Sequence, residues 1–274
     1  MVDVSTADPL LKVRDLRIAL PSGADRAFAV QDISFDLAKD DILCVVGESG
    51  SGKSMTANAI MGLLPEPHVR PTGGSIEFEG EELLTKSKSE LRKLRGNRIG
   101  MIFQEPMTAL NPLMRIGDQI AEVFDAHGML TRSERREKTL SLLADVSLPD
   151  IHLIIDSYPF RLSGGQRQRV MIAMALALEP EMLIADEPTT ALDVTTQAQI
   201  LALIKKIQAT KHMGVMFITH DFGVVAEIAD RVAVMQTGNI VELGEAKEVL
   251  NNPRHPYTKR LISAVPKFDP PERD

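Results

Sequence analysis

Short apolar runs recur along the chain and predict buried strands of a parallel sheet. Four of them are too short for helices and are bounded by polar or glycine-rich segments: Ile42–Val46, Gly100–Phe103, Met182–Ala185 and Val215–Thr219. Helical patterns lie between several of these runs, as at Met55–Leu64, where Pro65 marks the expected end. Alternation of strand and helix predicts an α/β fold.

Two parts of the chain depart from this alternation. Residues 10–37 and 74–80 read as β-rich, with alternating polar and apolar positions at 75–79. Between residues 104 and 162 the pattern is helical, over Ile116–His127 and Thr131–Val146, with Ser133 as the expected helix start. The sequence therefore predicts a helical subdomain inserted into an α/β core.

The segment after the first apolar run predicts a phosphate-binding loop. It fits the pattern of glycine, any four residues, then Gly-Lys-Ser, and it stands between a strand and a helix. Glycines allow backbone N–H groups to turn toward phosphate, the lysine reaches the β- and γ-phosphates, and the serine hydroxyl binds Mg²⁺. The expected nucleotide contacts are Gly47, Glu48, Ser49, Gly50, Ser51, Gly52, Lys53, Ser54 and Met55.

A second glycine-rich turn, Leu162–Gln166, also precedes a helical pattern and forms another anion-binding arrangement. One chain thus carries two phosphate-type surfaces but only one lysine-bearing loop. The economical explanation is that each surface holds one side of a nucleotide across a dimer. The contacts expected from this turn are Ser163, Gly164, Gly165 and Gln166.

Polar residues follow three of the other predicted strands, where a parallel sheet places ligands and catalytic groups. Asp186 is expected to hold Mg²⁺ and Glu187 to polarise the water that attacks the γ-phosphate. The amide of Gln104 can contact both Mg²⁺ and water, and His220 can donate to a γ-phosphate. The predicted catalytic set is Glu187, His220 and Gln104, and the predicted Mg²⁺ ligands are Ser54, Gln104 and Asp186.

Two further motifs are ambiguous from sequence. Asp193 is either a nucleotide-site residue or the N-cap of the helix that runs through Ile200 and Ile207, and both roles are kept. Asp221-Phe222-Gly223 matches a kinase triplet, but the companion kinase motifs do not accompany it. We therefore expect it to begin a helix after His220.

Composition narrows the class of protein. The net charge of −7 argues against broad nucleic-acid binding, and the basic cluster at residues 86–98 reads as a solvated helix face. No apolar run reaches the length of a membrane span, and the first residues do not read as a signal peptide. Cys44 is the one cysteine, so no cysteine-ligated iron–sulfur site is expected.

These motifs, in this order, resemble those of ATP-binding cassette (ABC) ATPases. Gly47–Ser54 looks like the Walker A loop, Gln104 the Q-loop, Leu162–Gln166 the signature motif, Leu183–Glu187 Walker B, Ala191–Asp193 the D-loop, and His220 the switch histidine. The resemblance implies a P-loop NTPase (RecA-like) core with an N-terminal antiparallel β subdomain and an inserted α-helical subdomain. It also implies that ATP and Mg²⁺ bind between two cassettes of a homo- or heterodimer.

Other stretches resemble the oligopeptide/dipeptide/nickel importer ATPases within this family. They are Gly47–Ser54, Phe103–Met107, Asn111-Pro112, Ala185–Asp193 and the tail Asn252–Thr258, with Leu261 and Pro266. The resemblance implies an ABC domain over about 1–250, with the core at about 1–104 and 162–250 and the helical subdomain at about 105–161. Residues 251–274 would form a C-terminal extension with the His-Pro-Tyr segment.

The same resemblance implies an ATPase at the cytoplasmic face of the inner membrane, bound peripherally to transmembrane permease subunits and served by an extracytoplasmic solute-binding protein. Apolar residues after Gln104 either contact that permease or pack within the subdomain; they are Met107, Leu110, Leu113, Met114 and Ile116. Phe28 is the candidate for stacking on adenine, with Leu20 at another alignment.

The residues do not specify the transported solute. They also do not decide whether this is a separate chain or the first half of a fused tandem protein. A second class of function is a soluble ABC ATPase that acts on nucleic acid or the ribosome. Proteins of that class usually carry coiled coils, zinc modules or two cassettes, and none of these features is recognisable in this sequence.

Overall fold

A six-stranded sheet forms the centre of the molecule, with strand order β10-β9-β3-β8-β7-β6. Pairing is parallel from β9 to β6, and only β10 runs antiparallel to its neighbour β9. The computed structural model describes residues 8–104, 109–128, 130–190 and 192–264. The strands are β3 Ile42–Val46, β6 Ile99–Ile102, β7 Met182–Asp186, β8 Gly214–Thr219, β9 Arg231–Gln236 and β10 Asn239–Glu245.

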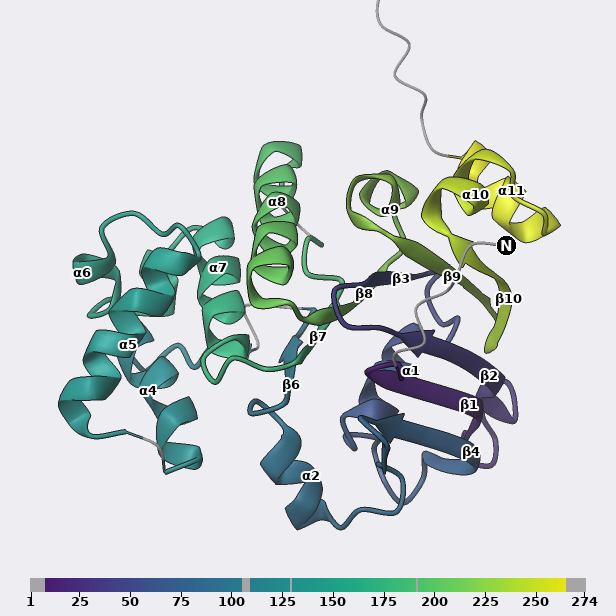
Figure 1. Ribbon diagram of the computed structural model, residues 1–274, viewed down its shortest axis with the longest axis horizontal. Coiled ribbons are helices and arrows are strands. Elements are labelled where there is room, and N and C mark those ends of the chain that lie inside the picture. Colours follow the sequence, from purple (N-terminus) through teal and green to yellow (C-terminus); the bar gives the residue numbers. More distant parts are fainter. Residues whose placement is uncertain (1–7, 105–108, 129, 191, 265–274) are drawn as a thin grey trace, which may run out of the picture.

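A smaller antiparallel sheet packs on one face of the central sheet (Figure 1). Its order is β2-β1-β4-β5, which confirms the predicted β-rich subdomain. These strands alternate buried and exposed positions because one face lies on the core and the other faces solvent. They are β1 Leu11–Ala19, β2 Phe28–Leu37, β4 Arg70–Phe78 and β5 Glu81–Glu82.

The central strands are apolar at nearly every position because both faces of this sheet are covered. Leu43 and Val45 point toward the small sheet and α1, whereas Cys44 and Val46 point toward α7, α8 and α9. The helices on and beside these faces are α1 Lys53–Ile60, α2 Lys88–Leu94, α7 Gly164–Ala175, α8 Val194–Lys211, α9 Phe222–Ile228, α10 Ala246–Asn251 and α11 Pro256–Ser263.

The predicted helical insertion is present and lies to one side of the sheet (Figure 1). Its helices α4 and α5 pack against each other and against α7, which joins the insertion to the core. Ile120, Phe124 and Leu143 are fully buried between them. The remaining elements are α4 Ile116–Ala126, α5 Arg132–Asp145, α6 Ile151–Ile154 and the 3₁₀ turn Pro159–Arg161.

Two helix boundaries differ from those predicted. Helix α5 starts after Thr131, whose side chain forms a capping box with Glu134, so Ser133 is not the start. Helix α1 ends at Ile60 instead of Leu64, because Gly62 takes a left-handed conformation with φ +60° and turns the chain before Pro65.

Two predictions about surface and helix chemistry are confirmed, the first of them in part. Helix α2 has no buried residue, as expected of a solvated face, whereas Arg98, beyond the helix, forms ion pairs with Glu79, Glu81 and Glu181. Asp221 caps α9 by accepting a hydrogen bond from the Gly223 N–H at 2.7 Å, so the kinase-like triplet is a helix start. Within the described residues, no helix is long and apolar enough to cross a membrane.

Because β8 lies in the middle of the central sheet, truncating one of its buried side chains should destabilise the fold. Phe217→Ala removes a fully buried ring and should lower the free energy of unfolding by about 3–5 kcal/mol. Phe160→Ala removes a ring that is 65% exposed and should cost less than about 1 kcal/mol. Urea denaturation measures both, and equal losses would contradict the placement of β8 in the core.

Candidate nucleotide site

The phosphate loop links β3 to α1, and its glycines are required by close backbone approaches. A Cβ on Gly47 would lie 2.1 Å from the Met235 carbonyl oxygen, and one on Gly52 would lie 2.7 Å from that of Ala29. Gly50 and Gly52 also have φ values of +77° and +108°, which side chains disfavour. The loop therefore has the tight curvature that directs backbone N–H groups inward.

Lys53 lies folded along this loop and is only 5% exposed. Its ammonium donates hydrogen bonds to the carbonyl oxygens of Gly47, at 2.7 Å, and Glu48, at 3.0 Å. Burial lowers the pKa of Lys53, and the carboxylates of Glu187 and Asp186 oppose that shift. A phosphate bound in this loop would therefore stabilise the charged form of Lys53.

Asp186 ends β7 beside the start of α1. The Ser54 hydroxyl donates to Asp186 Oδ1 at 3.1 Å, and the aspartate is only 7% exposed. Burial raises the pKa of the Asp186 carboxyl, while the hydrogen bond from Ser54 opposes that shift.

A hydroxyl and a carboxylate oxygen side by side fit Mg²⁺, which prefers oxygen ligands and keeps several waters or phosphate oxygens of its own. The described residues contain no group of three or more acidic, histidine or cysteine side chains that could hold a metal alone.

Three side chains converge on a single carboxylate oxygen, Glu187 Oε2. Gln104 Nε2 donates to it at 3.1 Å and Thr190 Oγ1 at 3.0 Å, and His220 Nδ1 lies 3.3 Å away. Gln104 follows β6, His220 follows β8, and Glu187 follows β7 between them in the sheet. The parallel sheet thus brings together the three residues of the predicted catalytic set, with Ser54 and Asp186 beside them.

The backbone at Glu187 is itself unusual. Its φ is +47°, a left-handed value for a residue other than glycine, and its N–H donates to the Ile218 carbonyl of β8 at 3.0 Å. The turn therefore directs the carboxylate away from the continuation of β7 and toward the residues that follow β6 and β8.

The second glycine turn has a structural role at the start of α7. Ser163 Oγ accepts from the Gln166 N–H at 3.2 Å, and Gln166 Oε1 accepts from the Ser163 N–H at 2.9 Å, forming a capping box on α7. Among the described residues, no hydrogen bond or ion pair joins this turn to the phosphate loop. Helices α1 and α7 pack on opposite faces of the central sheet.

Two other candidate residues have contacts of their own. Asp193 caps α8, accepting from the Thr196 N–H at 3.0 Å and its hydroxyl at 2.7 Å, so the N-cap interpretation is confirmed. The Phe28 ring lies under the Arg17 guanidinium, 5.5 Å from its centroid, at the start of β2. The neighbouring D-loop residue Ala191 lies outside the described residues.

Three contacts near the site were not anticipated from sequence. Arg26 donates to the Gly50 carbonyl from the loop between β1 and β2, and Thr190 orients Glu187. Tyr257, from the C-terminal His-Pro-Tyr segment, reaches Glu48 of the phosphate loop. The His-Pro-Tyr segment was a visible motif, but nothing in its residues indicated this partner.

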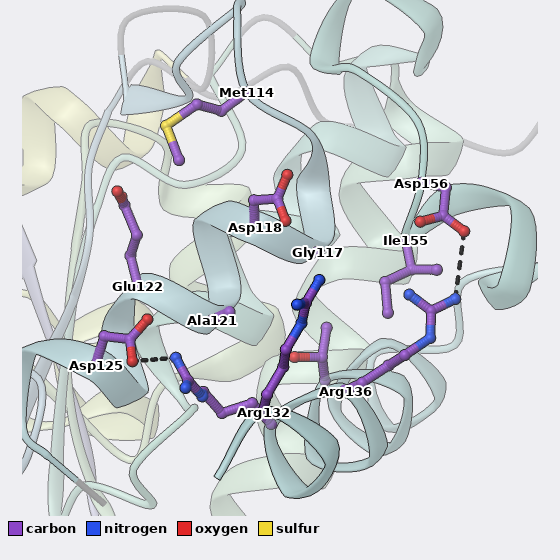
Figure 2. Close-up of a pocket in the computed structure, with 12 residues that line it drawn as sticks. Met114, Gly117, Asp118, Ala121, Glu122, Asp125, Arg132, Arg136, Ile155 and Asp156 are labelled. Carbon is purple, nitrogen blue, oxygen red and sulfur yellow. Dashed lines mark hydrogen bonds and ion pairs between the residues drawn. The ribbon is translucent and has the colours of Figure 1, made fainter. Parts of the chain in front are cut away.

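A separate charged pocket of about 470 Å³ lies in the helical insertion (Figure 2). Arg136 pairs there with Asp156 at 3.3 Å, and Arg135 pairs with Asp125. None of its lining residues belongs to the phosphate loop or to the ends of β6, β7 and β8. The pocket is therefore not part of the nucleotide site.

Comparison with known sequences identifies the family. Residues 30–190 match the ABC transporter family, and residues 241–274 match the oligopeptide/dipeptide transporter C-terminal region. The chain belongs to the ABC transporter family. The match at its C-terminal region agrees with the subgroup resemblance, and the ABC match supports ATP hydrolysis as the activity of the fold.

Similar proteins extend this assignment. The peptidoglycan transport ATP-binding protein YejF of Agrobacterium fabrum is 51% identical over 98% of this chain, which covers 50% of that relative. The dipeptide transport ATP-binding protein DppD of Bacillus subtilis is 48% identical over 96% of this chain and 78% of its own length. The chain thus spans half of the first relative and most of the second.

A solved structure confirms the fold class. The dimeric ABC transporter cassette MJ0796 superposes with a TM-score of 0.76 and 28% identity, covering 86% of this chain and 98% of that one. A second structure of MJ0796 is a post-hydrolysis state bound to ADP and phosphate, with a TM-score of 0.76 and 29% identity.

The raised pKa of Asp186 predicts a pH-dependent stability effect. A carboxyl whose folded pKa lies above its unfolded value destabilises the fold above that folded pKa, and the cost disappears below the unfolded pKa of about 4. Asp186→Asn keeps an acceptor for Ser54 and should raise the unfolding temperature at about pH 7, with a gain that shrinks toward about pH 4.

Thermal unfolding without nucleotide or metal measures this effect. Asp25→Asn, at an exposed loop position, is the matched control and should change little at either pH. An Asp186→Asn variant that unfolds at or below the parent temperature at neutral pH contradicts the prediction.

Proposed function

We propose that this chain is the ATP-hydrolysing subunit that powers a membrane importer of peptides or similar small solutes. The observation that carries this proposal is the convergence of Gln104, Thr190 and His220 on Glu187, next to the Ser54–Asp186 pair and the phosphate loop. The importer-type C-terminal region and the transport relatives support the coupling to import.

The residues divide the chemistry among them. Backbone N–H groups of the loop and the Lys53 ammonium bind the phosphates, and Ser54, Asp186 and Gln104 hold Mg²⁺. The metal ion, when bound, neutralises charge on the phosphate oxygens. Glu187 accepts a proton from the attacking water, and its contacts with Gln104, Thr190 and His220 keep its carboxylate oriented. His220 is 60% exposed in the single chain, so it can also donate to a γ-phosphate.

Two cassettes would complete each site, head to tail. Ser163 and Gly165 of one chain would face the Lys53 loop of the other. The packing of α1 and α7 on opposite faces of the central sheet supports this arrangement, as does the dimeric related cassette. The α7 N-terminus adds backbone N–H groups and partial positive charge for a phosphate. Asp193, which caps α8, would lie near the same interface.

An apolar groove next to Gln104 is the proposed docking site for a transmembrane permease subunit. It has a volume of about 460 Å³, and Phe103, the residue before Gln104, lines it while 46% exposed. The groove lies between the core and the helical insertion, so a bound helix could sense their relative position. Other lining residues include Met61, Leu63, Met101, Leu110, Val123, Met171 and Met174.

The contact candidates after Gln104 separate into two groups. Leu110 and Ile116 are 3% and 0% exposed and pack within the fold, although Leu110 also lines the groove. Leu113 is 86% exposed and is available to a partner. Met114 is partly buried and lines the charged pocket of the insertion. Met107 lies outside the described residues.

The proposed domain boundaries, location and adenine-stacking residue are those implied by the resemblance to the ABC family. The ABC domain spans about 1–250, with a core at about 1–104 and 162–250, a helical subdomain at about 105–161, and an extension at 251–274. We place the chain at the cytoplasmic face of the inner membrane, held by its permease, with a solute-binding protein on the other side. Phe28 is the proposed adenine-stacking residue.

Replacing the proposed general base tests the function. Glu187→Gln should lower the ATP hydrolysis rate at least about 100-fold, because an amide cannot accept the proton. ATP should still bind, and size-exclusion chromatography with ATP and Mg²⁺ should show a stable dimer. Glu137→Gln, at an exposed position on α5, should hydrolyse ATP like the parent. A Glu187→Gln variant with the parent's rate would rule out this base.

Replacing Ser163 tests the shared site. Ser163→Ala should reduce ATP turnover at least about tenfold while leaving ATP affinity of the single chain within about twofold. The substitution also removes a helix cap, so Ser87→Ala, which breaks an equivalent capping box on α2, is the matched control. Equal loss of turnover and single-chain binding in the Ser163 variant would contradict assembly across a dimer.

A further inference from the structure

The C-terminal extension reaches the phosphate loop through one side chain, Tyr257. Its hydroxyl accepts a hydrogen bond from the Glu48 N–H at 3.1 Å and donates to Glu48 Oε2 at 3.3 Å. The tyrosine is 4% exposed and belongs to the main apolar core. Residues 209 positions apart in sequence are therefore joined by two hydrogen bonds at the nucleotide site.

The His-Pro-Tyr segment holds this tyrosine in place. His255 caps α11, its Nδ1 accepting from the Tyr257 N–H at 3.2 Å, and Pro256 occupies the first helical position. Glu242 on β10 accepts from the backbone N–H groups of Arg254, at 2.7 Å, and His255, at 3.1 Å. The segment is thus anchored to the central sheet before Tyr257 enters the core (Figure 1).

Glu48 is held on both sides of its Cα atom. Tyr257 occupies its N–H, while its carbonyl oxygen accepts from the Lys53 ammonium at 3.0 Å and from the Ser51 N–H at 3.2 Å. A restraint on Glu48 therefore acts on the residue whose carbonyl oxygen positions Lys53. Glycine-rich loops lose conformational entropy when they order around a ligand, and a preset loop loses less.

We propose that Tyr257 is a positioning residue for the phosphate loop, holding Glu48 so that the loop binds a nucleoside triphosphate without first ordering. This inference rests on the proposed ATPase function. The effect concerns the affinity for nucleotide and not the hydrolytic step, because among the described residues the Tyr257 hydroxyl bonds to Glu48 and not to Glu187 or the side chains around it.

The hydroxyl of Tyr257 distinguishes a positioning role from a role in core packing alone. Ring burial alone would be satisfied by phenylalanine, whereas both polar contacts of the phenol are to Glu48. Burial raises the pKa of Tyr257, so the phenol keeps its proton and can donate to the Glu48 carboxylate at neutral pH.

Tyr257→Phe in the full chain tests the inference. The Kd for ATP and the KM of hydrolysis should each rise about 3- to 10-fold, the range expected for loss of a hydrogen bond, while kcat stays within about twofold. Tyr158→Phe is the matched control, since it alters the other tyrosine of the chain, in the helical insertion, and should leave Kd within about twofold.

The outcomes distinguish this inference from the proposed function. A parent chain that binds and hydrolyses ATP, with a Tyr257→Phe variant of unchanged Kd and KM, overturns the role of Tyr257 alone. A fall in kcat with unchanged KM also overturns it. A parent chain that neither binds nor hydrolyses ATP overturns the proposed function, and this inference with it.

A measurement on the parent chain covers the case in which the variant fails to fold. Residue-resolved hydrogen exchange without nucleotide should show the Glu48 amide protected at least about tenfold, because it donates to a buried hydroxyl. A Glu48 amide that exchanges at the rate of an unstructured loop overturns the proposal.

Discussion

Parallel pairing of β3, β8, β7 and β6 is the constraint on which the nucleotide site depends. Because these strands run in one direction, their carboxyl ends meet at one edge, where the chain delivers the phosphate loop, His220, Glu187 and Gln104. Both faces of the sheet are covered, so the strands cannot shift without exposing apolar side chains. The packed sheet therefore fixes the relative positions of Glu187 and the side chains around it.

The site contains two buried ionisable groups, Lys53 and Asp186, and burial shifts the pKa of each toward its neutral form. Burial disfavours the cation of Lys53 and the anion of Asp186, so each ionised group gains from a ligand of opposite sign. In the function that we propose, a nucleotide with Mg²⁺ would supply a phosphate for the lysine and a cation for the aspartate. In the single chain, carbonyl oxygens of Gly47 and Glu48 hold the lysine, and the Ser54 hydroxyl holds the aspartate.

The helical insertion and the C-terminal extension both lie close to residues of the nucleotide site. The apolar groove beside the helical insertion ends at Phe103, directly before Gln104, which contacts Glu187. The C-terminal extension reaches Glu48, whose carbonyl oxygen contacts Lys53. Each addition is thus one residue or one hydrogen bond away from a residue to which we assign a role in binding phosphate or water, which is a short path for coupling.

The sequence by itself determined the α/β class, the buried parallel strands, the helical insertion and the identity of the polar residues at the strand ends. Its local patterns suffice there because a strand covered on both faces must be apolar throughout, and a phosphate loop needs glycines at set spacings. Only the tertiary structure decided that α1 ends at Ile60, that Ser163 caps α7 and that Tyr257 binds Glu48. The end of α1 and the Ser163 cap depend on backbone conformation within a few residues, which the pattern of polar and apolar positions does not specify. Tyr257 and Glu48 lie 209 positions apart, and only packing in three dimensions brings their side chains together.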